Sequence, residues 1–317
     1  MTVPSRRSSW REITPAWRLR AFYGAHIRPH LSSRMKDLVY RASRRWDLWL
    51  ITPLVTRARG PKWRRSRVRV GIDITYVCDL RCNNCNRSCT QDPTSDHMSL
   101  GQIRHFLEES KERHIRWELI GLLGGEPTCH PQFLEVVELV REYRDGFSPD
   151  TQIRVVTNGH SERTKRLLSQ LLPDVEVIDS AKSSHDQPEF FSFNVAPIDV
   201  GGYERADFLN ACPVTHLCGV GVTPYGYYPC GVAGAIDRTF GFDLGRKVLP
   251  EDDDDMKEEI RRFCSLCGRF KAYTGELSRG QLDRAVMSPT WVEAYARSRE
   301  NRPRLSRLPE QPDTSKG

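Results

Sequence analysis

The sequence predicts an α/β fold built on a parallel sheet. Segments at 68–76, 117–123 and 153–156 are rich in apolar and β-branched residues, as strands are. Each runs into a turn rich in glycine, cysteine or polar residues, and helical patterns separate them. Such alternation gives a parallel sheet, whose ligands lie at the carboxyl ends of its strands. We therefore expect the functional residues in the turns that follow these strands.

Composition is that of an ordinary globular protein. The 317 residues are 38% apolar and 28% charged, enough for one large domain or two modest ones. The sequence shows neither an apolar run of transmembrane length nor the apolar block of a signal peptide. Ten cysteines without a secretory signal favour metal or redox use in a reducing compartment over a disulfide framework. We expect a cytoplasmic protein.

Residues 1–67 differ from the rest of the chain in charge. They hold 17 Lys and Arg against 3 Asp and Glu, and five of the seven tryptophans, whereas the remainder is net acidic. Within them, 35–54 is expected to form a helix that carries Trp46 and Trp49. A basic helix with tryptophans suits a peripheral membrane surface, an anionic partner or a nucleic-acid backbone. The alternative is a strap whose tryptophans pack on the body; we predict a docking arm without a catalytic role.

The first predicted strand leads into Cys78, Cys82 and Cys85, a Cys-x3-Cys-x2-Cys run. Structural zinc sites use four protein ligands, whereas a three-ligand site leaves a position open. Iron–sulfur clusters are held by cysteine thiolates at such short spacings. A four-iron cluster on three cysteines has one iron free to bind a small molecule. The alternative is a zinc site completed by Cys89, which is otherwise a loop thiol.

Two glycine-containing turns follow the next two predicted strands. They are Gly124, Gly125, Glu126 and Pro127 after the second strand and Thr157, Asn158 and Gly159 after the third. Glycine lets a backbone come close to a ligand and offers its N–H group. In their order and positions, the cysteine run and the two turns resemble the radical S-adenosylmethionine (SAM) superfamily.

The resemblance implies a partial (β/α)6 barrel with a [4Fe-4S] cluster on the three cysteines, its fourth iron chelated by the amino and carboxylate groups of SAM. It implies that reduction by a flavodoxin- or ferredoxin-type donor cleaves SAM to methionine and a 5′-deoxyadenosyl radical, which takes a hydrogen atom from the substrate. Glu126 would accept from the SAM ammonium group and Asn158 would bind its ribose. The sequence departs from the family at Asn84, where an aromatic residue is usual.

The remaining core elements continue the alternation. We expect helices at 100–113, 131–143 and 162–172, and strands at 175–178 and 191–195. Cys129 and His130 follow the Gly-Gly-Glu-Pro turn near the mouth of the site. His130 is interpreted as a helix-start residue bonded to the backbone.

The C-terminal half holds five more cysteines around a predicted β-hairpin at 220–228. They are Cys212, Cys218, Cys230, Cys264 and Cys267. The acidic run 251–255 is expected to open a helix leading to the last two. This region resembles the SPASM/twitch extensions of radical SAM enzymes, which implies a second, auxiliary [4Fe-4S] cluster on Cys212, Cys230, Cys264 and Cys267. Cys218 is an alternative ligand or a free thiol, and a zinc knuckle is the alternative site.

The predicted organisation has four parts. They are a basic extension (1–67), a radical SAM core (68–205), an auxiliary-cluster subdomain (206–275), and a C-terminal helix with a disordered tail (276–317). The expected reaction is epimerisation or dehydrogenation of a small polar, sugar-, aminoglycoside- or nucleoside-like substrate, with Cys218, Cys89 and Cys129 as candidate hydrogen-donor thiols. A peptide maturase, a sulfur-transfer enzyme and a non-catalytic metal-binding, nucleic-acid-associated protein are the alternatives.

Overall fold

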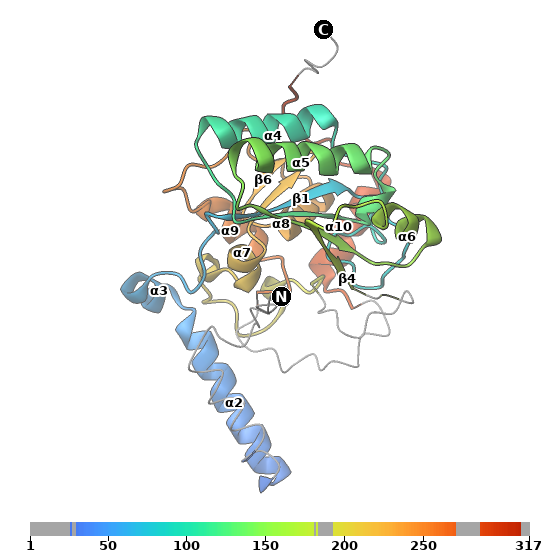
Figure 1. The fold of residues 1–317 in the computed structure, drawn as a ribbon. Coiled ribbons are helices and arrows are strands. Elements are labelled where there is room, and N and C mark those ends of the chain that lie inside the picture. Colours follow the sequence, from blue (N-terminus) through green and yellow to red (C-terminus); the bar gives the residue numbers. More distant parts are fainter. Residues whose placement is uncertain (1–25, 27–29, 181, 183–192, 271–285, 312–317) are drawn as a thin grey trace.

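The computed structural model describes residues 26, 30–180, 182, 193–270 and 286–311 (Figure 1). In this part of the chain a six-stranded sheet has the order β4-β3-β2-β1-β5-β6. The strands are β1 (Arg69–Thr75), β2 (Leu119–Gly124), β3 (Gln152–Thr157), β4 (Val175–Asp179), β5 (Val220–Thr223) and β6 (Gly226–Tyr228). All neighbours pair in parallel except β5 and β6. The predicted α/β class with a mostly parallel sheet is confirmed.

Helices cover both faces of this sheet, as Figure 1 shows. The helices of the body are α4 (Leu100–Glu112), α5 (Phe133–Phe147), α6 (Glu162–Leu168), α7 (Pro213–Leu217), α8 (Gly231–Phe240), α9 (Lys257–Cys264) and α10 (Pro289–Glu300). Helices α4 and α5 lie together over one face, and α8 lies with α9 and α10 over the other. Before the sheet come α2 (Ser33–Leu50) and α3 (Pro53–Arg59), and α2 points away from the body.

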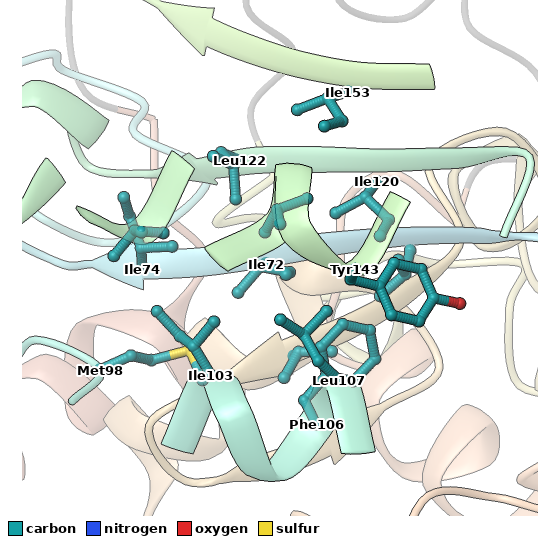
Figure 2. Packing of buried hydrophobic residues seen from close by; sticks show 14 of the residues in the cluster. Ile72, Ile74, Met98, Ile103, Phe106, Leu107, Ile120, Leu122, Tyr143 and Ile153 are labelled. Atoms are coloured by element: carbon teal, nitrogen blue, oxygen red, sulfur yellow. The ribbon is translucent and has the colours of Figure 1, made fainter. Parts of the chain in front are cut away.

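The main core lies between the sheet and α4 and α5. Its strand residues come from adjacent parallel strands, and Ile103, Phe106 and Leu107 of α4 pack against them (Figure 2). Burial of such apolar side chains contributes about 1.5–3 kcal/mol each. The Ser99 hydroxyl caps α4 by accepting a hydrogen bond from the Gln102 N–H. In return, the Ser99 N–H donates to the side-chain oxygen of Gln102. This capping box fixes where the helix starts.

The parallel pairing places the ends of β1, β2 and β3 side by side. Strand β1 pairs with β2 from Arg69 opposite Leu119 to Thr75 opposite Gly124, and β2 pairs with β3 in parallel as well. The cysteine run and the two glycine turns therefore leave the same edge of the sheet, as predicted from the order of the strands.

The hairpin at 220–228 forms as predicted, but it extends the main sheet. Strand β5 pairs in parallel with β1, so that Val70 lies opposite Val220. Gly219, at φ 83°, permits this approach, because a Cβ there would lie 1.9 Å from the Arg69 carbonyl oxygen. As a result α8, which starts after Cys230, lies against the strand that carries the first cysteine run.

Four local predictions are wrong. The helix expected at 35–54 ends at Leu50, and Pro53 starts the separate helix α3. Residues 193–195 of the predicted strand 191–195 form a turn and bend, and its other two residues lie outside the described part. The acidic run 251–255 precedes α9, which begins only at Lys257, because Asp254 and Asp255 are engaged with Arg246 and Arg67. The expected tail is ordered over 302–311: the Leu308 N–H donates to the Pro224 carbonyl and its side chain is buried.

Candidate active site

A cavity of about 220 Å³ opens where β1, β2 and β3 end. Of the ten cysteines, all in the described residues, three line it: Cys78, Cys82 and Cys85. Predicted residues that also line it are Gly124, Gly125, Thr157 and Asn158. The cavity therefore brings together the cysteine run and both glycine turns. Other residues of its wall were not found from the sequence: Leu80, Asn86, Arg87, Leu123, Val156, Ser180 and Lys182.

The two glycines are required by the backbone next to them. Gly124 has φ 135°, and a Cβ there would lie 2.1 Å from the Thr75 carbonyl oxygen. A Cβ on Gly125 would lie 2.2 Å from the Val77 carbonyl oxygen. The Gly125 and Glu126 N–H groups donate to the Thr75 and Val77 carbonyls, both at 2.8–2.9 Å. These N–H groups hold the base of the cysteine loop, so the expectation that a glycine of this turn offers its N–H group to a ligand is wrong for Gly125.

Glu126 joins the two glycine turns. Its carboxylate is fully buried and accepts from the Thr128 N–H and hydroxyl, the Thr157 hydroxyl and the Asn158 N–H, the last at 2.8 Å. Burial raises the pKa of Glu126 while these donors oppose the rise. Neither Glu126 nor Pro127 lines the cavity. In this structure Glu126 fixes the position of Asn158 relative to the cysteine loop.

Asn158 contacts the cysteine loop directly. Its amide nitrogen donates to Asp79 Oδ1 at 2.7 Å and lies 3.8 Å from Cys78 Sγ. Its amide oxygen accepts from the His160 N–H. A polar side chain from the end of β3 is thus held against the first cysteine of the run.

The thiols of the cavity differ in acidity. Burial raises the pKa of Cys78 to about 12 and also raises that of Cys82. A hydrogen bond with the Cys89 thiol lowers the pKa of Cys85 to about 6 and raises that of Cys89. A metal centre binds thiolates, so its binding would displace protons from this set.

The other predicted thiols lie outside this cavity. Cys89 is buried behind Cys85, and its thiol faces the Arg87 carbonyl at 3.8 Å. Cys129 is partly buried at the end of the turn, and Cys218 is exposed at the end of α7. His130 bonds the Met98 carbonyl and the Gln132 N–H, which confirms its interpretation as a helix-start residue.

The second predicted cysteine set also comes together. Cys212, Cys230, Cys264 and Cys267 are all buried and line one small apolar cavity of about 20 Å³. Cys218 does not line it. Burial raises the pKa of Cys212 and Cys230 to about 12 and that of Cys264 well above its usual value. Four cysteines from separate segments thus line one space, and four thiolates are a donor set that suits a cluster or zinc.

An ion pair lies between the two cysteine sets. Arg87, on the wall of the first cavity, donates from Nε to Asp73 Oδ2 at 2.7 Å. Its guanidinium lies against Gly231, where a Cβ would be 2.7 Å from Nη2, next to Cys230. Asp73 is fully buried in β1, and burial raises its pKa although Arg87 opposes this. The sequence did not single out Arg87 as a residue of the site, because it is one of many arginines in the chain.

Removing one partner of this pair should be costly. Arg87→Met leaves the Asp73 carboxylate buried without its cation, and we expect a loss of about 3–5 kcal/mol in the free energy of unfolding. The double variant Asp73→Leu/Arg87→Met should recover more than half of that loss. Denaturant unfolding of the metal-free chain measures both. Equal destabilisation by the single and the double variant would contradict a paired charge.

Among the described residues, no group of three or more His, Cys, Asp or Glu is arranged to hold a single metal ion. No helix among those residues combines the length and apolarity needed to cross a bilayer.

Comparison with known proteins finds one family profile that matches part of the chain. Residues 72–182 match the profile of the Radical SAM superfamily. The GTP 3′,8-cyclase of Haemophilus ducreyi is 29% identical over 111 residues, 35% of this chain and 32% of that protein. The mycofactocin maturase MftC of Mycobacterium ulcerans is 29% identical over 109 residues, 33% of this chain and 27% of that protein. The chain thus spans about a third or less of the length of these relatives.

Solved structures were compared as well. BtrN in complex with AdoMet and 2-DOIA aligns with 71% of this chain and 100% of its own, at 13% identity and a TM-score of 0.38. Streptococcus suis SuiB bound to precursor peptide SuiA aligns with 36% of this chain and 24% of its own, at 16% identity and a TM-score of 0.28.

Proposed function

We propose that this chain is a radical SAM enzyme that cleaves SAM at the cavity formed by the ends of β1, β2 and β3 and takes hydrogen from a small polar substrate. The observation that carries the proposal is the cavity lining: three cysteines, not four, share it with the two glycine turns. Three thiolates suit a [4Fe-4S] cluster with one iron left for SAM. When bound and reduced, the cluster and SAM supply the 5′-deoxyadenosyl radical.

The residues of this chain would hold and orient that chemistry. Cys78, Cys82 and Cys85 would ligate the cluster, and Asn158, held by Glu126 and Asp79, would lie beside it. Lys182 and Arg87 give the wall basic groups that suit the SAM carboxylate. Polar side chains on this wall, among them Asn158 and Ser180, would bond the hydroxyl groups of a sugar- or nucleoside-like substrate.

We further propose an auxiliary [4Fe-4S] cluster on Cys212, Cys230, Cys264 and Cys267, as in SPASM/twitch extensions. What supports it is the convergence of these four cysteines on one cavity. The donor set of four thiolates suits either a cluster or zinc. Anaerobic reconstitution with iron and sulfide should give about eight irons per chain. A saturated value of about four irons, or bound zinc, would remove the auxiliary cluster.

Two other activities remain as alternatives. The match to a mycofactocin maturase leaves peptide maturation open, and the auxiliary cluster leaves sulfur transfer open. A non-catalytic, nucleic-acid-associated metal protein is the alternative of another class. Metal binding alone does not require the two glycine turns, so their presence favours the enzyme. Coupled formation of 5′-deoxyadenosine with sugar, nucleoside or peptide substrates separates these possibilities.

The outcome of the reaction depends on a hydrogen donor. A substrate radical can be oxidised, giving a dehydrogenated product, or take hydrogen from a thiol, giving an epimer. We propose Cys218 as that thiol, since it is exposed and belongs to neither cysteine set. Cys218→Ala should still form 5′-deoxyadenosine but lose the epimer, whereas wild type should incorporate one solvent deuterium. An unchanged product, or loss of iron, would contradict the donor role and favour oxidation or ligation.

A further inference from the structure

Among the described residues, helix α2 contacts the body near its C-terminal end. Its 18 residues span about 27 Å at 1.5 Å per residue. Arg44 Nη2 donates to the Gly201 carbonyl at 2.6 Å, Asp47 is buried, and Leu48 packs on the cluster that contains Ile51. Figure 1 shows the rest of the helix extending away from the sheet and its covering helices. Its outer side chains therefore have no core of their own to enter.

An apolar stripe runs along this helix. It consists of Met35, Leu38, Ala42, Trp46 and Trp49. These positions follow a spacing of three and four residues and so share one face. All five are exposed: Leu38 by 68%, Trp46 by 59% and Trp49 by 48%. The two indole rings lie 5.0 Å apart at 31°, beside each other on the stripe. The alternative of a strap with its tryptophans packed on the body is therefore wrong for this pair.

A basic row lies beside the apolar stripe. It consists of Arg34, Arg41 and Arg45, each one residue before a member of the stripe, and all three are exposed. The helix has five basic and two acidic residues; of the acidic two, Asp47 is buried and Asp37 pairs with Arg41 in solvent. The stripe is thus bordered by positive charge.

More positive charge gathers where the arm joins the body. A groove of about 550 Å³ runs between α3 and α9. Its lining holds four basic residues, Arg57, Arg64, Lys257 and Arg261, and two acidic ones, Asp207 and Asp255, of which Asp255 pairs with Arg67. The basic surface therefore continues from the arm onto the body.

We propose that α2 is an interfacial helix that docks this enzyme on an anionic lipid bilayer. Tryptophan and leucine would enter the headgroup region while the basic row meets anionic headgroups. The helix is too polar to span a bilayer, so it would lie on one. Charge argues against a second copy of the chain, because paired stripes would bring two basic rows together. A nucleic-acid backbone would need the arginines but not the exposed apolar stripe.

Vesicle co-sedimentation of the full chain tests this proposal. We expect binding to mixed phosphatidylglycerol and phosphatidylcholine vesicles that is at least about tenfold stronger than to phosphatidylcholine alone. Trp46→Ser/Trp49→Ser should weaken it by at least about tenfold. The matched control Ile198→Ser/Val248→Ser, which removes side chains exposed by 56% and 57% elsewhere, should leave it unchanged.

The charge contribution has its own variants. Arg34→Gln/Arg45→Gln should weaken binding by roughly fivefold per arginine, and added salt should do the same. Arg166→Gln/Arg304→Gln, two exposed arginines elsewhere, serve as the control. All substituted side chains are exposed, so circular dichroism should show an intact fold.

Three results would overturn the proposal. The first is equal binding to neutral vesicles, or no binding to either kind. The second is a dimer, seen by light scattering, that the tryptophan variant dissolves. The third is a DNA or RNA duplex that binds more tightly than vesicles and is lost only with the arginines. None of these measurements requires iron or SAM, so they stand apart from the proposed activity.

Discussion

Replacing Cys78, Cys82 and Cys85 together by alanine is expected to abolish SAM cleavage and to leave about half of the bound iron. The three thiols line one cavity, and no other cysteine does. Without them nothing in that cavity holds a cluster, whereas the second cysteine set is untouched. The measurements are 5′-deoxyadenosine formation after reduction and the iron content after anaerobic reconstitution.

Cys129→Ala is the matched control for this prediction. Cys129 belongs to the same end of the sheet but lies outside the cavity lining. Its variant should keep both the iron content and SAM cleavage. If the triple variant still forms 5′-deoxyadenosine, the assignment of these three cysteines is wrong.

Removing the second set should have the opposite pattern. In Cys230→Ala/Cys264→Ala we expect iron to fall from about eight to about four per chain, with SAM cleavage retained and product formation lost. Both side chains are buried around the apolar cavity, so no other described side chain there can replace two thiolates. Iron content, 5′-deoxyadenosine and product are measured on the same sample. An unchanged iron content would show that these cysteines do not hold a cluster.

The positions of the strands and of the chemical groups at their ends were predictable, because both depend on short stretches of sequence. Runs of apolar and β-branched residues define β1, β2 and β3, and parallel pairing then brings the residues after them to one edge. Cysteine spacing and glycine turns likewise depend on short stretches of chain. The cavity with Cys78, Gly125 and Asn158 on its wall could therefore be anticipated before any coordinates.

What escaped prediction depends on contacts between distant segments. Glu126 was expected to face SAM, but donors from Thr157 and Asn158 surround its carboxylate. The role of Arg87 depends on Asp73, fourteen residues earlier on a buried strand. The segment 302–311, polar and rich in proline, is ordered because Leu308 finds a buried place beside Pro224. Short stretches of sequence do not show which distant residues will become the partners of a side chain in the fold.

The most direct test of the proposed chemistry uses the Cys230→Ala/Cys264→Ala variant, which should keep only the cluster on Cys78, Cys82 and Cys85. Its electron paramagnetic resonance spectrum is recorded after reduction, with and without SAM. Because one iron of that cluster has no protein ligand, SAM should change the spectrum and then be cleaved to 5′-deoxyadenosine. A reduced cluster whose spectrum is the same with and without SAM would contradict the proposal.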